Sequence, residues 1–442
     1  MPLSPQNLAL SRLNAAAPGF EAEFAGLLAS KRETAADVGA QVAEIIARVR
    51  GEGDAALLAL TERFDGHRPA PGRLRVGAAA IESAVAEVPP ETLAALKMAI
   101  TRITDYHRRQ KPEDLWYRDA AGVGLGHRWT AVAAAGLYVP GGLAAYPSSL
   151  LMNAIPAQVA GVARLVVAVP APGGVVSPLV LAAAQLLGID EIYPIGGAQA
   201  IAALAYGTES IQPVDKVVGP GNAYVATAKR QVFGQVGIDM IAGPSEILVL
   251  ADGANDPRWI ALDLLSQAEH DPASQAILIT DDAAFADAVA AAVAAALDDL
   301  PRAEIARASW LEHGAIIEVA RLEEAIPLID RFAPEHLELA IEAPRAFAES
   351  IRNAGSIFLG RYTPEAIGDY MAGPNHVLPT ARSARFSSGL SVLDFMKRSS
   401  LISCDAASLQ VIGPAAACLA EAEGLDAHAA SLRLRLGEHP KP

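Results

Sequence analysis

The feature that most constrains the fold of this chain is a regular alternation of short apolar runs with longer amphipathic stretches, which begins near Trp129 and continues to about Arg385. Runs such as RLVVAVP and EILVLAD have the length and the Val, Ile and Leu content of buried strands. Alanine-rich stretches of helical length follow such runs, and glycine or proline separates the two kinds of segment. Strands that alternate with helices are typical of a parallel sheet with crossover helices. The sequence therefore predicts the α/β fold class.

The alternation falls into two blocks, which predicts two Rossmann-like domains, each an incomplete, doubly wound parallel sheet. One block ends at DKVVGPGN, and the next begins at EILVLAD. The first 110 residues and the chain after about Arg385 have helical patterns, so we expect helical N-terminal and C-terminal extensions. The expected parts are an N-terminal extension at 1–24, a first domain at 25–137 plus 246–385, a second domain at 138–245 and a C-terminal extension at 386–442.

Composition and charge exclude several classes of protein. An apolar fraction of 52% and a charged fraction of 19% are globular values. A net charge of −15 argues against a nucleic-acid partner, because binding phosphates needs a basic surface. The most apolar stretch, 159–189, is broken by Arg164 and by several prolines and glycines, so it predicts a strand, a turn and a helix and no membrane span.

Targeting signals and cysteine usage point to the cytoplasm. The start of the sequence has no basic segment followed by a continuous apolar run, so we expect no secretion signal. Cys404 and Cys418 fit neither a disulfide framework nor a CxxC metal motif, which favours a reducing compartment. We therefore expect a soluble, cytoplasmic protein.

The sequence SQAEHD contains the first candidate site. Gln267 and His270 are three residues apart near the end of a helix that we expect to begin at Asp256-Pro257, so both project from one helix face. A helix C-terminus carries partial negative charge and favours a cation. The alternative is a polar helix end in which His270 interacts with the dipole, since glutamine is an uncommon zinc ligand.

A second candidate site is the adjacent pair Glu335 and His336 in APEHLELA. A carboxylate and an imidazole are the usual general acid and base near neutral pH. On a regular helix adjacent side chains point about 100° apart, so the two would face different parts of one site. The alternative is the solvated start of a helix.

Two further segments carry candidate ligands. The glycines and prolines of GDYMAGPNHVLPT predict a loop, in which Asp369 offers a hard oxygen and His376 a softer nitrogen. Ordinary turn chemistry is the alternative there. Near the C-terminus, EAEGLDAHAA contains Glu423 and His428, which taken alone fit a surface helix.

Three glycine-rich turns are candidates for binding a cofactor. GLYVPGG, YPIGGAQA and VVGPGNAY are not GxGxxG fingerprints, but each follows a predicted strand. Backbone N–H groups of such turns can bind a phosphate. Tyr138, Gln199 and Asn222 lie in these turns, at the strand ends where open α/β sheets bind ligands. Tight connections between elements are the alternative.

Taken together, these segments resemble the histidinol dehydrogenase family. The resemblance rests on eight stretches that occur in the family's order and cover the chain from about Val132 to His428, namely GLYVPGGLAAYPSSLLMNAIPAQVAG, PIGGAQAIAALAYGT, DKVVGPGNAYVATAKRQVFG, IDMIAGPSEILVLAD, LLSQAEHDP, RFAPEHLEL, GDYMAGPNHVLPTARSARFSSGLSV and AEGLDAH. The first 110 residues contribute little to it.

The resemblance implies a role for each candidate residue. It implies a catalytic pair, Glu335 and His336, and one Zn²⁺ per subunit held by Gln267, His270, Asp369 and His428. The implied substrate contacts are Ser245, Gln267, His270, His336, Asp369, His376, Glu423 and His428. The implied NAD⁺ contacts are Tyr138, Gln199 and Asn222. Most of the zinc and catalytic residues then belong to the first domain, and the second domain binds the dinucleotide.

The resemblance also implies the reaction and the assembly. L-histidinol is oxidised to L-histidine through L-histidinaldehyde with two NAD⁺, as the last step of histidine biosynthesis. The zinc holds the amino and imidazole nitrogens of the substrate. The family forms an intertwined homodimer, in which the C-terminal extension with Glu423 and His428 reaches the site of the partner subunit.

Three alternative functions remain open at the level of sequence. A related NAD-dependent dehydrogenase could oxidise another small alcohol, such as a sulfonated propanediol, but Glu423 and His376 match the histidinol type. A zinc hydrolase would also use a metal with a carboxylate and an imidazole. The strand-end turns at Tyr138, Gln199 and Asn222 argue against that reading. A binding or scaffold protein without catalysis would not need every matched position to keep its chemistry.

Overall fold

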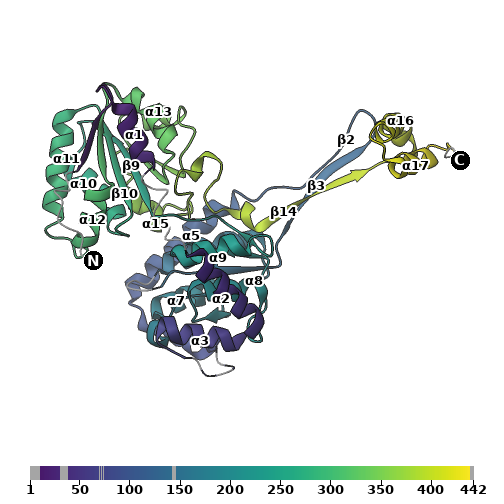
Figure 1. Cartoon of the computed structure of the whole chain (residues 1–442), viewed down its shortest axis with the longest axis horizontal. Helices are drawn as coiled ribbons and strands as arrows, with labels where there is room; N and C mark the ends of the chain where they lie inside the picture. The colour runs from purple at the N-terminus through teal and green to yellow at the C-terminus, as the bar shows by residue number, and fades with distance from the viewer. Residues whose placement is uncertain are drawn as a thin grey trace.

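The protein consists of two α/β lobes and a long arm that projects from them (Figure 1). The computed structural model describes residues 10–29, 38–68, 70, 72, 74–141 and 146–438. The expected α/β class with parallel sheets is confirmed. Among these residues we found no helix that combines the length and the apolar character needed to cross a membrane.

The first lobe is built on a parallel sheet, which has six strands in the described part of the chain, in the order β1-β11-β10-β9-β12-β13. When β9, β10, β11, β12 and β13 are numbered 1 to 5 along the chain, their order in the sheet is 3-2-1-4-5. This is the arrangement of a Rossmann-type sheet. The strands are β1 (Ser11–Asn14), β9 (Glu246–Ala251), β10 (Gln275–Thr280), β11 (Ala315–Glu318), β12 (His336–Ala340) and β13 (Ser356–Leu359).

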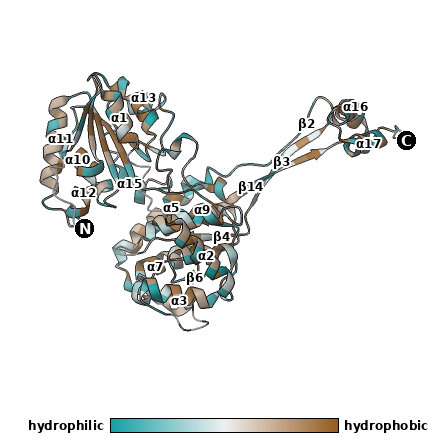
Figure 2. Cartoon of the chain, viewed as in Figure 1, coloured by the Kyte–Doolittle hydropathy of each residue, from teal (hydrophilic) through white to brown (hydrophobic). Residues whose placement is uncertain are grey.

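Helices cover both faces of this sheet. Ile260 and Trp310 pack on one face, and Phe24 and Leu328 pack on the other. Strands buried on both faces read as continuous apolar runs, which Figure 2 shows as brown ribbons. The helices of this lobe are α1 (Phe20–Ala29), α10 (Pro257–Ala268), α11 (Ala283–Ala296), α12 (Ala303–His313), α13 (Ala325–Phe332), α14 (Pro344–Ala348) and α15 (Glu365–Tyr370).

The second lobe repeats the same topology on a sheet of five described strands, in the order β6-β5-β4-β7-β8. These are β4 (Ala134–Tyr138), β5 (Arg164–Ala168), β6 (Ile192–Tyr193), β7 (Lys216–Val218) and β8 (Gly237–Ile238). Its helices are α2 (Gly39–Glu52), α3 (Asp54–Asp65), α4 (Ala78–Glu87), α5 (Pro90–Arg108), α6 (Pro147–Ala160), α7 (Pro178–Leu187), α8 (Gly197–Tyr206) and α9 (Ala223–Val232). Helices α4 to α7 cover one face of the sheet, and α2, α3, α8 and α9 cover the other.

The N-terminal third of the chain is divided between the lobes differently from our expectation. We grouped 25–137 with 246–385 and treated 1–24 as an extension. In the structure β1 is the edge strand of the first sheet, whereas α2 to α5 pack on the second sheet. The physical reason is that both faces of the second sheet are apolar and must be covered. Helices α6 to α9 share that task with α2 to α5.

The arm contains an antiparallel sheet that we did not expect in the C-terminal extension. Its strands are β2 (Leu115–Arg118), β3 (Gly124–Ala131) and β14 (Met396–Ser403), with β3 in the centre. Helices α16 (Ala406–Ala422) and α17 (Asp426–Arg435) pack together at its end. The expectation of helix from about residue 386 is therefore wrong for 396–403. Pairing with β3 is a long-range interaction that the local pattern does not show, and without it an edge of β3 would be left open.

The two cysteines agree with the expectation of no disulfide. Cys404 and Cys418 lie in this arm, and both are exposed and unpaired.

Two helix starts have the side-chain caps that their local sequence favours, and one of them is the expected start at Asp256-Pro257. The Ser177 hydroxyl accepts a hydrogen bond from the backbone N–H of Leu179 at 3.3 Å, and Gly188 ends the helix α7 with a φ of 70°. The Asp256 carboxylate accepts one from the N–H of Arg258 at 2.9 Å at the start of α10. Proline follows each cap, at the first helical turn, where its missing N–H is not needed.

Candidate active site

The pair Glu335 and His336 lies at the start of the buried central strand β12, beside the start of β9. This corrects the helical geometry considered for these residues. Helix α13 ends at Ala333, which has a left-handed φ of 48°, and the chain then turns into the sheet. Glu335 directly precedes the strand, and its Oε2 lies 3.8 Å from Nδ1 of His336, so the two side chains stay close to each other.

The carboxylate of Glu335 is fixed by the neighbouring strand. Its Oε2 accepts a hydrogen bond of 2.8 Å from the backbone N–H of Glu246, the first residue of β9. In return, the backbone N–H of Glu335 donates to Oε2 of Glu246 at 3.3 Å. Both side chains are buried. The orientation of Glu335 is thus set by backbone geometry and not by a flexible loop.

His336 presents an unprotonated nitrogen to the interior of the site. Its Nδ1 is 2.8 Å from the backbone oxygen of Glu246, which can only accept, so Nδ1 must donate. In the neutral ring Nε2 then carries no proton. Nε2 is buried, makes no hydrogen bond with any described residue, and lies 3.6 Å from Oε1 of Glu365. This tautomer makes Nε2 a proton acceptor.

Helix α10 delivers Gln267 and His270 to the same region. Gln267 is fully buried, and both its amide oxygen and its amide nitrogen lack a hydrogen-bond partner among the described residues. Leaving both polar atoms of a buried amide unpaired is unfavourable. A ligand that binds at this position would remove that penalty. His270 follows the helix and is exposed.

Helix α15 brings Asp369 next to His336. Oxygens of Glu365 and Asp369 and a ring nitrogen of His336 all lie within 4.8 Å of one another. Burial, and after it the charge of Glu365, raises the pKa of the Asp369 carboxyl well above its usual range. These groups offer one compact set of donors.

The loop predicted for this segment is partly a helix. Gly368, Asp369 and Tyr370 form the end of α15. A Cβ at Gly368 would lie 2.6 Å from the ring of Phe358, so this glycine permits close packing of the helix on β13. The glycine that suggested a loop therefore has a packing role.

His376 and Ser245 complete the inner part of the site. Nδ1 of His376 is 3.1 Å from the backbone oxygen of Asp369, and burial lowers the pKa of His376 to about 4. Its ring is therefore neutral near pH 7. Ser245 is half-buried directly before β9, and its backbone oxygen accepts a hydrogen bond of 3.0 Å from the N–H of Gln275.

The donor atoms suit a zinc ion. Carboxylate oxygens and imidazole nitrogens are ligand types of catalytic zinc sites, which also keep a coordination position open for substrate, whereas an amide oxygen is a less common ligand. The unpaired polar atoms of Gln267 and the compact grouping around Asp369 agree with a cation at this place.

Glu423 and His428, which the sequence grouped with this site, do not lie near the site of their own chain. Glu423 directly follows α16, and His428 lies in α17. Both are exposed, and these helices stand at the far end of the arm (Figure 1).

Tyr138, Gln199 and Asn222 all lie at or after the carboxyl ends of strands in the second sheet. Tyr138 ends β4, and its hydroxyl accepts a hydrogen bond from the backbone N–H of Gly197 at 3.1 Å. Burial raises the pKa of Tyr138 to about 12. Gln199 is buried in α8, and Asn222 is the exposed N-cap of α9.

The turn after β7 approaches the end of β4 very closely. A Cβ at Gly219 would lie 2.1 Å from the backbone oxygen of Tyr138, and Gly219 has a φ of 114°. Strands β4 and β7 are neighbours at the point where the strand order reverses, the place where open α/β sheets bind ligands. The N-terminus of α9 is a suitable position for a phosphate.

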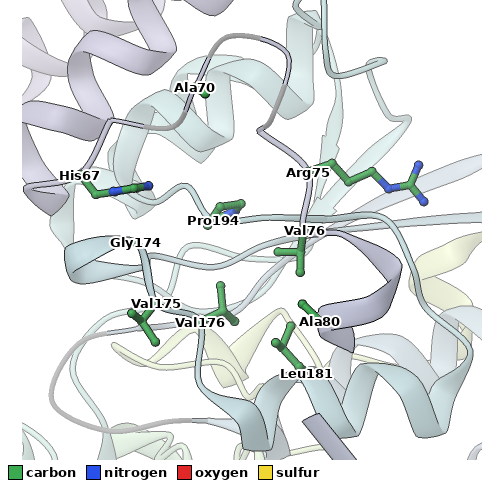
Figure 3. Close-up of a pocket in the computed structure, with 10 residues that line it drawn as sticks. All are labelled: His67, Ala70, Arg75, Val76, Ala80, Gly174, Val175, Val176, Leu181 and Pro194. Atoms are coloured by element: carbon green, nitrogen blue, oxygen red, sulfur yellow. The ribbon is translucent and has the colours of Figure 1, made fainter. Parts of the chain in front are cut away.

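A separate hollow of about 460 Å³ lies at the far side of the second lobe. In Figure 3 the side chains of Val76, Val176 and Leu181 gather in it, and Arg75 points away. Its lining includes neither the candidate catalytic residues nor Tyr138, Gln199 and Asn222. It therefore adds nothing to the definition of the site.

Comparison with known proteins decides the family. The sequence model described as histidinol dehydrogenase matches residues 28–436. A histidinol dehydrogenase of Rhodospirillum rubrum is 64% identical over 426 residues, which are 96% of this chain and 98% of that protein. One of Rhizobium meliloti is 62% identical over 429 residues, or 97% of this chain and 99% of the other. The crystal structure of histidinol dehydrogenase from Elizabethkingia anophelis matches with a TM-score of 0.92 and 37% identity, covering 97% of this chain and 98% of that one.

The chain belongs to the histidinol dehydrogenase family. The resemblance seen in the sequence is thereby confirmed. As a member of the histidinol dehydrogenase family, the chain is an oxidoreductase.

Two residues of this histidinol dehydrogenase site were not found from the sequence. Glu246 holds Glu335 and His336 in place, and Glu365 shares the donor cluster with Asp369. Glu365 lies four residues before Asp369, a spacing that places both on one side of a helix, so a helical reading of this segment could have found it. The role of Glu246 depends on the pairing of β9 with β12, which no local motif shows.

Proposed function

We propose that this protein is a cytoplasmic enzyme that oxidises L-histidinol to L-histidine through bound L-histidinaldehyde, with two NAD⁺ and one zinc per subunit, as the last step of histidine biosynthesis. The observation that carries the proposal is the grouping of His336 and Asp369 near the fixed carboxylate of Glu335, together with buried polar atoms of Gln267 and His336 that lack a partner among the described residues. The family relationship supports the substrate.

Gln267, His270 and Asp369, with His428 of a second copy, would hold the zinc. Zinc held there would orient the substrate through its amino and imidazole nitrogens, so that the alcohol carbon faces the nicotinamide. The neutral ring of His376 beside Asp369 suits a contact with an uncharged imidazole. NAD⁺ would bind beside Tyr138 and the turn that precedes Asn222.

In the first oxidation His336 accepts a proton. Nε2 of His336 takes the proton of the substrate alcohol while the hydride on the same carbon leaves for NAD⁺, so that an aldehyde and NADH form. The fixed tautomer keeps the lone pair of Nε2 directed into the site. A base held in this way needs little reorientation when the reaction occurs.

In the second oxidation Glu335 activates water. Its carboxylate removes a proton as the water attacks the aldehyde carbon, and the resulting hydrate gives up a second hydride to NAD⁺. The backbone N–H of Glu246 keeps Oε2 of Glu335 in one position, so the carboxylate that would take the proton is already oriented. Burial of the site keeps the reactive aldehyde from escaping.

A homodimer with exchanged arms is part of the proposal. The arm leaves large apolar side chains in solvent, with Ile402, Val411 and Leu419 each more than 60% exposed. Near the site, Leu262 of α10 and Tyr370 of α15 are exposed as well. Exposed apolar surface of this kind is typical of interfaces. The second copy is the partner that would bring His428 to the zinc ligands.

The test is the yield of NADH for each histidinol consumed, measured with and without added zinc. We expect two NADH per histidinol, and loss of activity on chelation without loss of the folded state, because the site holds the metal for catalysis. A yield of one, or full activity in protein shown to be metal-free, would contradict the proposal.

A further inference from the structure

Glu365, the first residue of α15, is a buried carboxylate that the reaction described above does not use. Its side chain is about 2% exposed. The hydroxyl of Ser266, the neighbour of Gln267, lies 3.2 Å from Oε2 of Glu365 and 2.7 Å from the backbone oxygen of Asp263, so the two oxygens share its single proton. One oxygen of the Glu365 carboxylate therefore contacts α10, the helix that carries Gln267.

The second oxygen of Glu365, Oε1, faces the donor cluster, and the carboxyl groups of Glu365 and Asp369 also interact through a side-chain hydrogen bond. Oε1 makes no hydrogen bond with any residue in the described part of the chain and lies 3.6 Å from Nε2 of His336. Glu365, His336 and Asp369 each place one ligand atom within 4.8 Å of the others. A buried, unpaired carboxylate oxygen is costly unless a cation or a donor occupies the space beside it.

Charge points to the same group. The ligand set proposed above contains one carboxylate, that of Asp369, while Gln267 and the two histidines are neutral. Zn²⁺ in that set leaves a net charge of about +1 in a largely buried site, which is unfavourable in low dielectric. One further carboxylate beside the metal brings the net charge to zero.

We propose that Glu365 is the second carboxylate of the zinc site, with Oε1 facing the metal and balancing its charge. This inference rests on the zinc site of the proposed function. It adds a residue that the family resemblance did not supply.

The experiment measures the zinc dissociation constant of the full-length protein by competition with a chelator. Glu365→Gln should raise this constant about 10-fold to 100-fold, the range found when groups that support a metal are removed. The absorption spectrum of the Co²⁺-loaded protein should change as well. The Tm of the metal-free variant should stay close to that of the wild type, because glutamine has nearly the same shape and volume as glutamate.

Glu338→Gln is the matched control. Glu338 is also a buried glutamate, but it lies further along β12 and outside the donor cluster. Burial raises its pKa well above the usual range, so its replacement removes little charge. We expect near wild-type zinc affinity and an unchanged Co²⁺ spectrum. If Glu338→Gln weakens zinc as much as Glu365→Gln does, the proposal is overturned.

Asp369→Asn separates this proposal from the zinc site itself. If wild type binds zinc, Asp369→Asn loses it and Glu365→Gln binds as wild type does, the role of Glu365 is wrong and the proposed function stands. If wild type binds no zinc, the proposed function fails. If Glu365→Gln does not fold, Glu365→Asp replaces it in the same assay. A change in zinc affinity of about 10-fold is then expected, and an unchanged affinity overturns the proposal.

Discussion

Lys229 and Asp239 form a buried ion pair that holds both backbone polar groups of Gly219. The Lys229 ammonium donates to the Gly219 oxygen at 2.9 Å, and the Asp239 carboxylate accepts from the Gly219 N–H at 2.8 Å. The ammonium and the carboxylate also contact each other, and both side chains are at most 2% exposed. The pair thus fixes the turn between β7 and α9, where we expect NAD⁺ to bind.

Lys229→Met should both destabilise the protein and weaken NAD⁺ binding. Removing one partner of a buried ion pair leaves the other charge uncompensated, at about 3–5 kcal/mol of unfolding free energy. We expect a higher KM for NAD⁺ and an unchanged KM for histidinol, since the pair lies in the second lobe. Urea unfolding and steady-state kinetics measure the two effects.

The double variant Lys229→Met with Asp239→Asn is the control. It leaves no buried charge, so it should recover part of the lost stability. Equal changes in both KM values, or no loss of stability in the single variant, would contradict the assigned role.

Glu335→Gln should separate the two oxidations. Glutamine can still accept the hydrogen bond from the N–H of Glu246, so the geometry is kept while the base is lost. Loss of general-base catalysis should slow oxidation of added histidinaldehyde by about 10²-fold to 10⁴-fold. The first hydride transfer, followed in a single turnover from histidinol, should change less. Equal losses in both half-reactions would show that the division of labour between Glu335 and His336 is wrong.

Asp263→Asn should stabilise the metal-free protein at alkaline pH. Burial, and after it the charge of Glu365, raises the pKa of Asp263 to about 7. In the unfolded chain it is about 3.9. Between these values the folded state keeps a proton that the unfolded state has lost. Compared with alkaline pH, the proton bound to Asp263 therefore stabilises the folded state. This stabilisation is complete below about pH 4 and is lost as the pH rises to about 7.

Denaturant unfolding at pH 4.5 and pH 8 measures this effect. We expect the unfolding free energy of Asp263→Asn to exceed that of the wild type by about 2–4 kcal/mol at pH 8, and by much less at pH 4.5. The same difference at both pH values would mean that Asp263 does not titrate in this range.

Exchange of arms between subunits predicts complementation. Asp369→Asn and His428→Asn should each inactivate the homodimer. A hybrid of the two has one site that carries both substitutions and one intact site, so it should recover about half of the wild-type activity. Differently tagged subunits allow the hybrid to be purified and assayed. An inactive hybrid would place His428 in the site of its own chain.

Local sequence predicted much of the fold because the signals are local. Apolar runs such as those of β9 and β10 identify strands buried on both faces, and Ser177 and Asp256 mark helix starts through their own hydrogen bonds. The two blocks of alternating strands and helices correspond to the two parallel sheets. None of this depends on which distant segments meet.

The parts that we predicted wrongly depend on distant segments meeting. Helices α2 to α5 belong to the second lobe because its sheet needs cover, and 396–403 is a strand because β3 offers an edge. The pair Glu335–His336 lies in a strand because β12 inserts between β9 and β13. In each case tertiary packing overrides the local pattern.

By itself, the sequence determined the family, the α/β class and the identity of the groups that can do chemistry, since these follow from residue types in a recognisable order. Tertiary structure decided what those groups do to one another. It chose the tautomer of His336 through the oxygen of Glu246, and it left the buried amide of Gln267 without a partner in the described part of the chain. It also placed Glu365 next to them. Such relationships depend on contacts between different elements, such as Glu246 with His336 and Ser266 with Glu365, 90 and 99 positions apart, which a reading along the chain cannot show.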